Sequence, residues 1–328
     1  MSRAGIANGA ALAAAIGLSL LGGLDRTPRA RDGLGGEQTI TSVRRVRLPS
    51  GEDGIADASG RILPLRAYRR IVSTSTLTDR LLADLSEPDR VLAFSSAGAR
   101  ASTGRWRFAG KPDVDGLGPL EPIVALKPDL VLMNASFGDG NGRIEKLRAA
   151  GMEVFNLGEL HGMATLLPMA EVIGALLGAP ERGVRYAQAF RARFARVAAP
   201  LHDRPQRQAL FIVVIAGSIY GGSTGTSYHD VLTHAGLVDV AAARYGGWPQ
   251  FSAEQVMALD PEVLVTKDDV ASALCTRPGL DVLRACRQPG HVLSVPADLL
   301  DDPGPGMLDA AEILFAKAYP ILAPKDPR

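Results

Sequence analysis

The sequence predicts an α/β protein of two Rossmann-like lobes with parallel sheets, joined by one long helix. Three observations predict this fold. Short apolar runs alternate with helical segments in both halves of the chain, a nearly continuous helical stretch separates the halves, and a segment around Glu121 recurs around Glu254. A length of 328 residues agrees with two domains of ordinary size.

The N-terminal segment has the pattern of an export signal. Residues 6–21 are apolar, carry no charge and follow Arg3. This stretch is shorter than the ~20 residues of a membrane-spanning helix. We therefore interpret residues 1–24 as a signal peptide or N-terminal anchor, with no cysteine to carry a lipid. Residues 25–56, rich in Arg, Gly and Pro, are expected to form a linker or extension, and the protein is expected to be periplasmic.

The N-terminal α/β lobe is predicted over residues 57–165. It begins with a turn at Asp57–Arg61 between two strand-like runs, which predicts a leading hairpin. Buried parallel strands are typically short continuous apolar runs. Such strands are expected at 70–73, 91–95, 130–134 and 153–157, and helices at 77–85 and 143–150.

A helical linker is predicted over residues 166–203, with a break at Gly178–Pro180. Its second part carries one apolar stripe at helical spacing, which includes Phe190 and Phe194. Residues 204–328 then repeat the alternation and predict the C-terminal α/β lobe. Its strands are expected at 209–216, 263–266 and 292–295, and its helices at 228–235 and 308–319.

The internal repeat aligns without gaps. LEPIVALKPDLVL at residues 120–132 matches AEQVMALDPEVLV at residues 253–265, and each copy reads as a short helix, a Pro-containing turn and a buried strand. Glu121 matches Glu254 in the first turn of each helix. A carboxylate there stabilises the helix dipole by roughly 0.3–1 kcal/mol. Alternatively, the two lobes present matched carboxylates to a two-part partner.

Composition argues against nucleic-acid and metal binding, but it does not decide whether the two cysteines are bonded. With 36 basic and 35 acidic residues, the net charge of +1 predicts no nucleic-acid binding. The five histidines show no zinc-ligand spacing, so no metal site is expected. Cys275 and Cys286 flank a turn and a short helix, and form either a disulfide or two buried thiols.

One motif suggests a hydrolase. Gly221–Gly225 fits G-x-S-x-G with Ser223 as nucleophile, and Asp268 and His291 follow in the order of an α/β-hydrolase triad. However, five residues separate the preceding strand from the motif, so the turn is not the tight elbow that this chemistry needs. The loop also lacks the lysine of a nucleotide-binding P-loop.

Aromatic residues are scarce, and many of them lie in loops. Loops at the carboxyl ends of parallel strands form the ligand crevice of α/β sheets, and rigid aromatic faces suit a large, flat, partly apolar ligand. Arginines in the loop around Trp106 either pair with an anionic ligand or are solvated. Eight of 17 aromatic residues lie in Gly-, Pro- or Ser-rich loops: Trp106, Phe108, Phe137, Tyr220, Tyr228, Tyr245, Trp248 and Phe251.

The two repeat copies, extended to WPQFSAEQVMALDPEVLV at residues 248–265, and the Asp57–Arg61 turn resemble one family. The chain is similar to the helical-linker, class III periplasmic binding proteins of ABC importers (the helical-backbone metal-receptor fold), which bind cobalamin, haem and ferric siderophores. The resemblance implies a monomeric, non-enzymatic solute-binding protein without an intrinsic cofactor. Its ligand would be a metal chelate, with a ferric siderophore ranked before haem and cobalamin. Gly304–Gly306 departs from the Gly-Pro-Arg of many members.

The resemblance also implies site residues. Glu121 and Glu254 would each dock onto arginines of a dimeric permease, and Tyr228 is the best single candidate for an axial haem ligand. An interaction or sensor module that kept the fold but lost transport is the alternative. The ligand would lie between the lobes, among Ser73, Ser95, Trp106, Asn134, Tyr220, Thr226, Tyr228 and Trp248.

Overall fold

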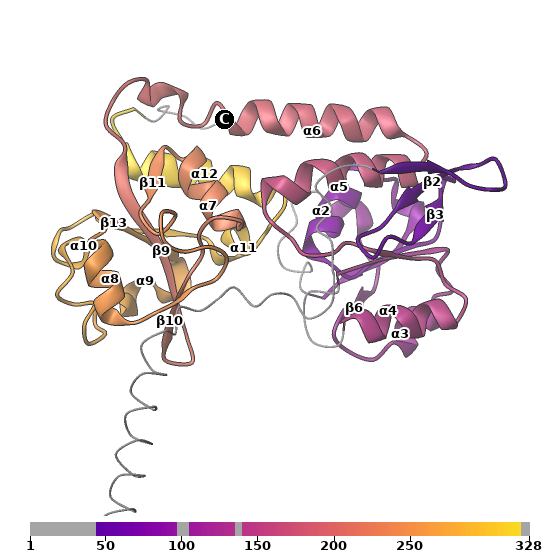
Figure 1. Cartoon of the computed structure of the whole chain (residues 1–328), viewed down its shortest axis with the longest axis horizontal. Helices are drawn as coiled ribbons and strands as arrows, with labels where there is room; N and C mark the ends of the chain where they lie inside the picture. Colours follow the sequence, from indigo (N-terminus) through magenta and orange to yellow (C-terminus); the bar gives the residue numbers. More distant parts are fainter. Residues whose placement is uncertain (1–43, 97–104, 135–139, 323–328) are drawn as a thin grey trace, which may run out of the picture. The chain divides into compact units, whose positions relative to one another are not determined.

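A computed structural model describes residues 44–96, 105–134 and 140–322, all within one unit that spans residues 36–328 (Figure 1). The predicted signal or anchor, Arg100, Phe137 and most of the predicted extension therefore lie outside the described residues. Within the described ranges, no helix is both long enough and apolar enough to cross a bilayer.

A small antiparallel sheet leads into the first lobe, in the order β1 (Arg45–Arg47), β2 (Asp53–Ala56), β3 (Ile62–Pro64). The predicted hairpin turn is confirmed between β2 and β3. There, the buried Asp57 carboxylate accepts hydrogen bonds from the backbone N–H groups of Ser59 and Arg61. We expected an extension before this hairpin, and the structure places an additional strand, β1, there, paired antiparallel to β2. Its short, charged sequence, RVR, gives little apolar signal.

The first large sheet is entirely parallel, as predicted, in the order β6-β5-β4-β7-β8. Its strands are apolar on both sides because both faces are covered. Val72 and Val131 pack with Ile144 of one helix, whereas Ile71 packs with Leu81 of another on the opposite face. The elements of this lobe are β4 (Ile71–Ser73), α2 (Thr76–Leu85), β5 (Val91–Ser95), η3 (Arg105–Phe108), β6 (Asp113–Val114), α3 (Glu121–Ala125), β7 (Leu130–Met133), α4 (Gly140–Ala149) and β8 (Val154–Asn156).

The segment predicted as a linker forms two helices, α5 (Met163–Leu176) and α6 (Pro180–Phe194), which pack against each other (Figure 1). The break occurs where it was expected, because Gly178 adopts a positive φ of 72° and Pro180 starts the next helix. A Cβ atom on Gly183 would lie 2.3 Å from the Ala170 carbonyl oxygen, so only glycine permits this close approach. The ring of Phe194 in α6 stacks on that of His234, 3.9 Å between centroids, and so links α6 to the second lobe.

The second large sheet is mixed, in the order β12-β10-β9-β13-β14, with β11 also paired to β9. The parallel strands β9, β13 and β14 were predicted, whereas the parallel β11 and the antiparallel β10 and β12 were not. β10 folds back on β9 through Ala216 and Gly217, both with positive φ. The elements are β9 (Arg207–Ile215), β10 (Ser218–Gly221), α7 (Ser227–His234), β11 (Leu237–Asp239), β12 (Gln250–Phe251), α8 (Ala253–Leu259), β13 (Val263–Lys267), α9 (Asp268–Leu274), α10 (Arg284–Arg287), β14 (Val292–Val295), α11 (Ala297–Leu300) and α12 (Gly306–Ala318).

The two copies of the repeat adopt the same local structure. α3 precedes β7 in the first lobe, and α8 precedes β13 in the second. Lys127 and Asp260, at matching positions after these helices, both have positive φ values, 48° and 39°. Such values are uncommon for residues other than glycine. The two copies of the repeat therefore share a backbone conformation as well as a sequence pattern.

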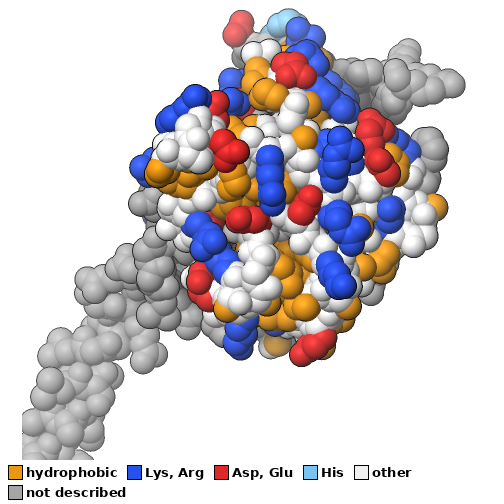
Figure 2. All heavy atoms as spheres, turned by 90° about the vertical axis from the view of Figure 1, so that its right-hand side faces the viewer, with side chains coloured by type: hydrophobic (Ala, Val, Ile, Leu, Met, Phe, Trp, Pro, Cys, Tyr) orange, Lys and Arg blue, Asp and Glu red, His pale blue; other side chains and the backbone are white. Residues whose placement is uncertain are grey.

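Charged side chains of both signs are interspersed on the face that Figure 2 presents, and apolar side chains lie between them. This mixture agrees with the near-neutral composition of the whole chain.

Candidate ligand and docking sites

An aromatic surface lies on the second lobe. Tyr228 is buried and stacks on Phe211, with ring centroids 4.1 Å apart. Trp248 meets Tyr228 edge-on at 4.6 Å, and half of its surface is exposed. The structure therefore brings together two of the predicted ligand residues and leaves the indole of Trp248 available to a ligand.

Two loops hold this surface in place. The loop after β10 runs beside the loop before β12, because the Ser223 N–H donates to the Gly247 carbonyl and the Gly247 N–H donates to that of Thr224. A Cβ atom on Gly222 would lie 2.7 Å from the Tyr228 ring. Thr226 is buried as the N-cap of α7, and Tyr220 is half-buried in β10. For Thr226 and Tyr220, contact with a ligand stays a prediction.

Tyr228 is connected to the carboxyl end of β13. Its hydroxyl donates to the Asp301 carboxylate at 2.8 Å, and the same carboxylate accepts from Lys267 Nζ at 2.8 Å. Burial, followed by the negative charge of Asp301, raises the pKa of Tyr228 well above its ordinary value. An axial haem ligand would have to be the tyrosinate form. Tyr228 is buried and its hydroxyl already donates to Asp301, so an iron would have to displace this hydrogen bond to bind it. Axial ligation by Tyr228 stays a prediction.

The predicted ligand residues of the first lobe lie at the carboxyl edge of its sheet. Ser73 and Ser95 are fully buried there. The Ser95 hydroxyl donates to Asp79 at 2.6 Å, and the Ser73 hydroxyl lies 2.6 Å from that of Thr78. These bonds attach α2 to the ends of two strands. Contact of either serine with a ligand stays a prediction.

Two further predicted ligand residues, Asn134 and Trp106, belong to the first lobe. Asn134 follows β7 and is half-buried, and Trp106 lies within η3. Phe108 is buried edge-on against Phe94 and fills the core. Arg107 pairs with Glu87 at 3.1 Å, so its charge already has a partner within the lobe.

A cavity of about 260 Å³ lies between α2, α6 and the start of α12. Its lining includes Arg80, Tyr186 and Phe190, and none of the predicted ligand residues. Its volume is below the roughly 300–1,000 Å³ typical of ligand pockets. Among the described residues, no cluster of His, Cys, Asp or Glu has the geometry of a metal site.

The surroundings of Ser223 do not support the less favoured hydrolase alternative. The serine side chain is fully buried, and its hydroxyl donates to Asp239 at 2.8 Å. His229 Nδ1 contacts the same carboxylate oxygen at 2.8 Å, so the carboxylate lies between the two other groups. His291 instead contacts the carbonyl of Glu262. The Ser223 hydroxyl therefore has no histidine base. The Asp239 carboxylate instead connects β11 to His229 of α7 and to Ser223 in the loop before α7.

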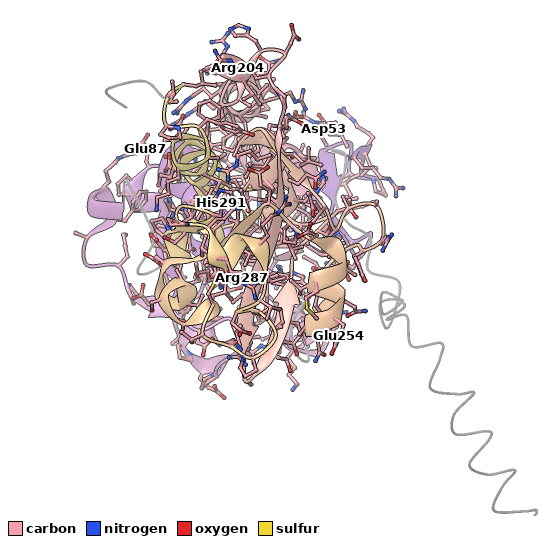
Figure 3. All side chains as sticks on the ribbon, turned by 90° about the vertical axis from the view of Figure 1, so that its left-hand side faces the viewer. Asp53, Glu87, Arg204, Glu254, Arg287 and His291 are labelled. Atoms are coloured by element: carbon pink, nitrogen blue, oxygen red, sulfur yellow. A yellow bond between two sulfur atoms is a disulfide. The ribbon has the colours of Figure 1, made fainter. Side chains whose placement is uncertain are left out.

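The two matched glutamates lie on exposed helix starts. Glu121 is in the first turn of α3 and is exposed. Glu254 is in the first turn of α8 and is also exposed (Figure 3). Ser252 and Gln255 form a capping box that fixes the beginning of α8. A hydrogen bond from Ser252 lowers the pKa of Glu254, so this carboxylate is anionic at neutral pH.

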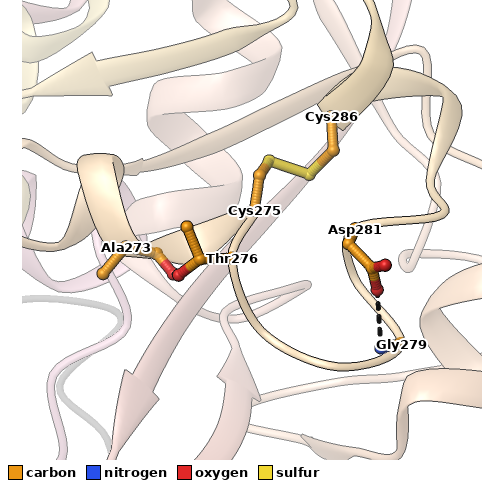
Figure 4. Close-up of a disulfide and its surroundings, with 6 residues drawn as sticks. All are labelled: Ala273, Cys275, Thr276, Gly279, Asp281 and Cys286. Atoms are coloured by element: carbon orange, nitrogen blue, oxygen red, sulfur yellow. Dashed lines mark hydrogen bonds between the residues drawn. A yellow bond between two sulfur atoms is a disulfide. The ribbon is translucent and has the colours of Figure 1, made fainter.

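The disulfide left open by the sequence is present between Cys275 and Cys286, whose Cα atoms are 5.5 Å apart (Figure 4). It closes a segment that touches the start of α8, because a Cβ atom on Gly279 would lie 2.7 Å from that of Ala253. Leu280 also packs in one apolar cluster with Val256 of α8. The disulfide-closed segment therefore supports the helix that carries Glu254.

Replacing Cys275 and Cys286 together with serine is expected to lower the free energy of unfolding by about 3 kcal/mol. The reason is that the cross-link restricts the unfolded chain across a short closed loop. Urea denaturation of both proteins measures the difference. Adding reductant should destabilise the wild type alone, and an unchanged wild-type midpoint in reductant would contradict the expectation.

Comparison with other proteins identifies relatives of this chain. The sequence profile described as periplasmic binding protein matches residues 71–299, more than half of the chain. A Bacillus subtilis protein named an uncharacterised ABC transporter substrate-binding lipoprotein, YvrC, is 27% identical over 208 residues, 61% of this chain and 65% of its own length. A cobalamin-binding protein of Halobacterium salinarum is 24% identical over 262 residues, 77% of this chain and 70% of its own.

Solved structures share the fold. A periplasmic haem-binding protein of Pseudomonas aeruginosa superposes with a TM-score of 0.68 at 24% identity, over 79% of this chain and 95% of that one. The vitamin B12-binding protein BtuF of Vibrio cholerae superposes with a TM-score of 0.63 at 22% identity, over 79% of this chain and 99% of that one. Both neighbours have the class III fold of two α/β lobes. The chain belongs to the periplasmic binding protein family.

Proposed function

We propose that this protein is the extracytoplasmic solute-binding component of an ABC importer and carries a large metal chelate of the corrinoid or haem type. The observation that carries the proposal is the half-exposed indole of Trp248, held edge-on against Tyr228. Tyr228, Asp301 and Lys267 connect this indole to the carboxyl end of a parallel strand, where α/β sheets bind ligands.

The proposed ligand order differs from the one drawn from sequence, which ranked a ferric siderophore first. Relatives from several organisms are named cobalamin- or vitamin B12-binding proteins, and fold neighbours are named haem-binding proteins. The Tyr228 side chain is buried and its hydroxyl already donates to Asp301, so a haem iron would have to displace this hydrogen bond to reach it. A corrinoid, whose metal needs no protein ligand, requires only surface contact. We therefore place cobalamin first and haem second.

The proposed partner is the importer's permease dimer. Each lobe carries one exposed glutamate at the start of a repeat helix. A pair of matched carboxylates suits a partner with two related subunits that each offer a basic side chain. Complementary charges of this kind mainly set orientation and association rate. We further propose that the protein acts as a monomer in the periplasm.

Calorimetric titration with cyanocobalamin, haemin and ferrioxamine tests the ligand. We expect cyanocobalamin to bind at micromolar concentration or below, and Trp248→Ala to weaken binding by about tenfold or more, because a large apolar contact is lost. Trp248→Phe is the matched control and should retain most of the affinity. If none of the three compounds binds at 100 µM (roughly −5.5 kcal/mol), the proposed ligand class is wrong. Tight binding to an importer without any ligand would favour an interaction module.

A further inference from the structure

The two repeat helices expose the same pattern of side chains. In α3, Glu121, Val124 and Ala125 are exposed, whereas Ile123 is completely buried. In α8, the residues at the matching positions behave alike: the exposed residues are Glu254, Met257 and Ala258, and the buried one is Val256.

The three exposed residues named for each helix lie on one face, whereas Pro122 of α3 is exposed beside them. Positions i, i+3 and i+4 of an α-helix are neighbours on its surface. Each helix therefore turns one apolar side chain into its lobe and presents outward a carboxylate beside two apolar side chains. We call these two sets, Glu121-Val124-Ala125 and Glu254-Met257-Ala258, the docking stripes.

A single exposed apolar residue is ordinary, and needs no explanation. The two large apolar residues of the docking stripes are different because they recur at matching positions. Val124 is 40% exposed and Met257 is 39% exposed. Among the helices that the structure describes, Val124 and Met257 are the only large apolar side chains exposed to this degree.

Both docking stripes are held rigidly. The Arg70 side chain donates to the carbonyls of Leu126 and Lys127, directly after α3. The disulfide-closed segment packs against α8, and a capping box fixes its start. Preorganised surfaces lose less conformational entropy on binding, so rigid stripes suit an interface.

We propose that each docking stripe makes a two-part contact with the permease. The carboxylate pairs with a basic side chain, and the apolar pair is buried against an apolar surface beside that basic side chain. The partner is therefore a two-fold dimer whose subunits each present a cation next to an apolar patch. This inference rests on the proposed function and adds an apolar component, which sets the lifetime of the complex, to the charged component, which sets orientation and encounter rate.

Binding kinetics of the full chain on the importer reconstituted in lipid nanodiscs test the inference. The stripe variant combines Val124→Ser with Met257→Ser. The control combines Val238→Ser with Ile62→Ser, at side chains that are 41% and 38% exposed but lie on strands. We expect the stripe variant to bind about 30-fold more weakly through faster dissociation, with an unchanged salt dependence. The control should change affinity less than about twofold.

A third variant, Glu121→Gln with Glu254→Gln, separates this inference from the function on which it rests. It should slow association and reduce the salt dependence. If the glutamine variant binds weakly but the stripe variant behaves like its control, the apolar contact is refuted and the docking role stands. If neither variant changes binding, the proposed docking face is wrong. Thermal unfolding and cyanocobalamin titration of each variant verify that the lobes remain intact.

Discussion

Replacing Glu121 and Glu254 together with lysine is expected to reduce uptake of the ligand by at least about 100-fold while leaving ligand affinity unchanged. Both carboxylates are exposed on different lobes, and neither contacts the aromatic surface around Trp248. In the proposed complex a lysine would face a basic side chain of the permease, and like charges placed together across an interface cost several kcal/mol. Because both sites are reversed at once, neither lobe can compensate for the other.

Transport of cyanocobalamin into proteoliposomes that contain the importer measures this effect, and calorimetry measures ligand affinity. The matched control is Glu52→Lys with Glu181→Lys, two exposed glutamates outside the repeat. It changes the net charge equally, and Glu181, like the docking glutamates, lies in the first turn of a helix. If the Glu121/Glu254 variant supports wild-type uptake, the docking role is refuted. The two carboxylates would then only stabilise the dipoles of their helices.

The central strands of both large sheets were predictable because their signal is local. Residues 91–95, for example, form a continuous apolar run that coincides with β5. β10 and β12 gave no such signal, since they are short, contain Gly221 and Gln250, and depend on the reversal at Ala216 and Gly217. Glu121 and Glu254 could be singled out for the same local reason, as they belong to a repeat that recurs in sequence, and their docking role stays a proposal.

The parts of the site that depend on tertiary contacts were not predictable. Ser73 and Ser95 lie at the strand ends where ligands bind, but strand side chains alternate between faces, and these two turn inward to α2. The G-x-S-x-G motif pointed to catalysis. Its serine instead donates to Asp239 of β11, a pairing that no spacing in the sequence indicates.

A buried ion pair between Arg80 and Asp302 was also missed, although it joins α2 of the first lobe to the segment before α12 of the second. The Arg80 Nε atom lies 2.8 Å from Asp302 Oδ2, and the two side chains are only 6% and 2% exposed. Asp302 also accepts hydrogen bonds from the N–H groups of Gly304 and Gly306. The residues are far apart in sequence, so only the fold reveals the pair.

Asp302→Ala is expected to lower the free energy of unfolding by about 3–5 kcal/mol, because it leaves the buried charge of Arg80 without its carboxylate. Urea denaturation measures this loss. Arg80→Met combined with Asp302→Leu should recover most of it, since removing both charges removes the desolvation penalty. If the double variant is as unstable as Asp302→Ala, the loss arises from packing or from the hydrogen bonds to Gly304 and Gly306.

The pH dependence of this pair gives a second measurement with a defined sign. Burial raises the pKa of Asp302 to about 6, against the opposing effects of Arg80 and the two backbone N–H groups. The ordinary value of an aspartate in an unfolded chain is about 3.9. Because the folded state then binds the proton more tightly, the contribution of Asp302 to stability is greatest below pH 4 and declines as the pH rises towards 6.

The difference in unfolding free energy between wild type and Asp302→Asn should therefore be larger at pH 5 than at pH 7.5, by roughly 1 kcal/mol. Subtracting the asparagine variant removes the contributions of the other titrating groups, which both proteins share. A difference that is smaller at pH 5 would mean that Arg80 and the backbone donors outweigh burial. The pair would then hold the lobes together more strongly at neutral pH than in acid.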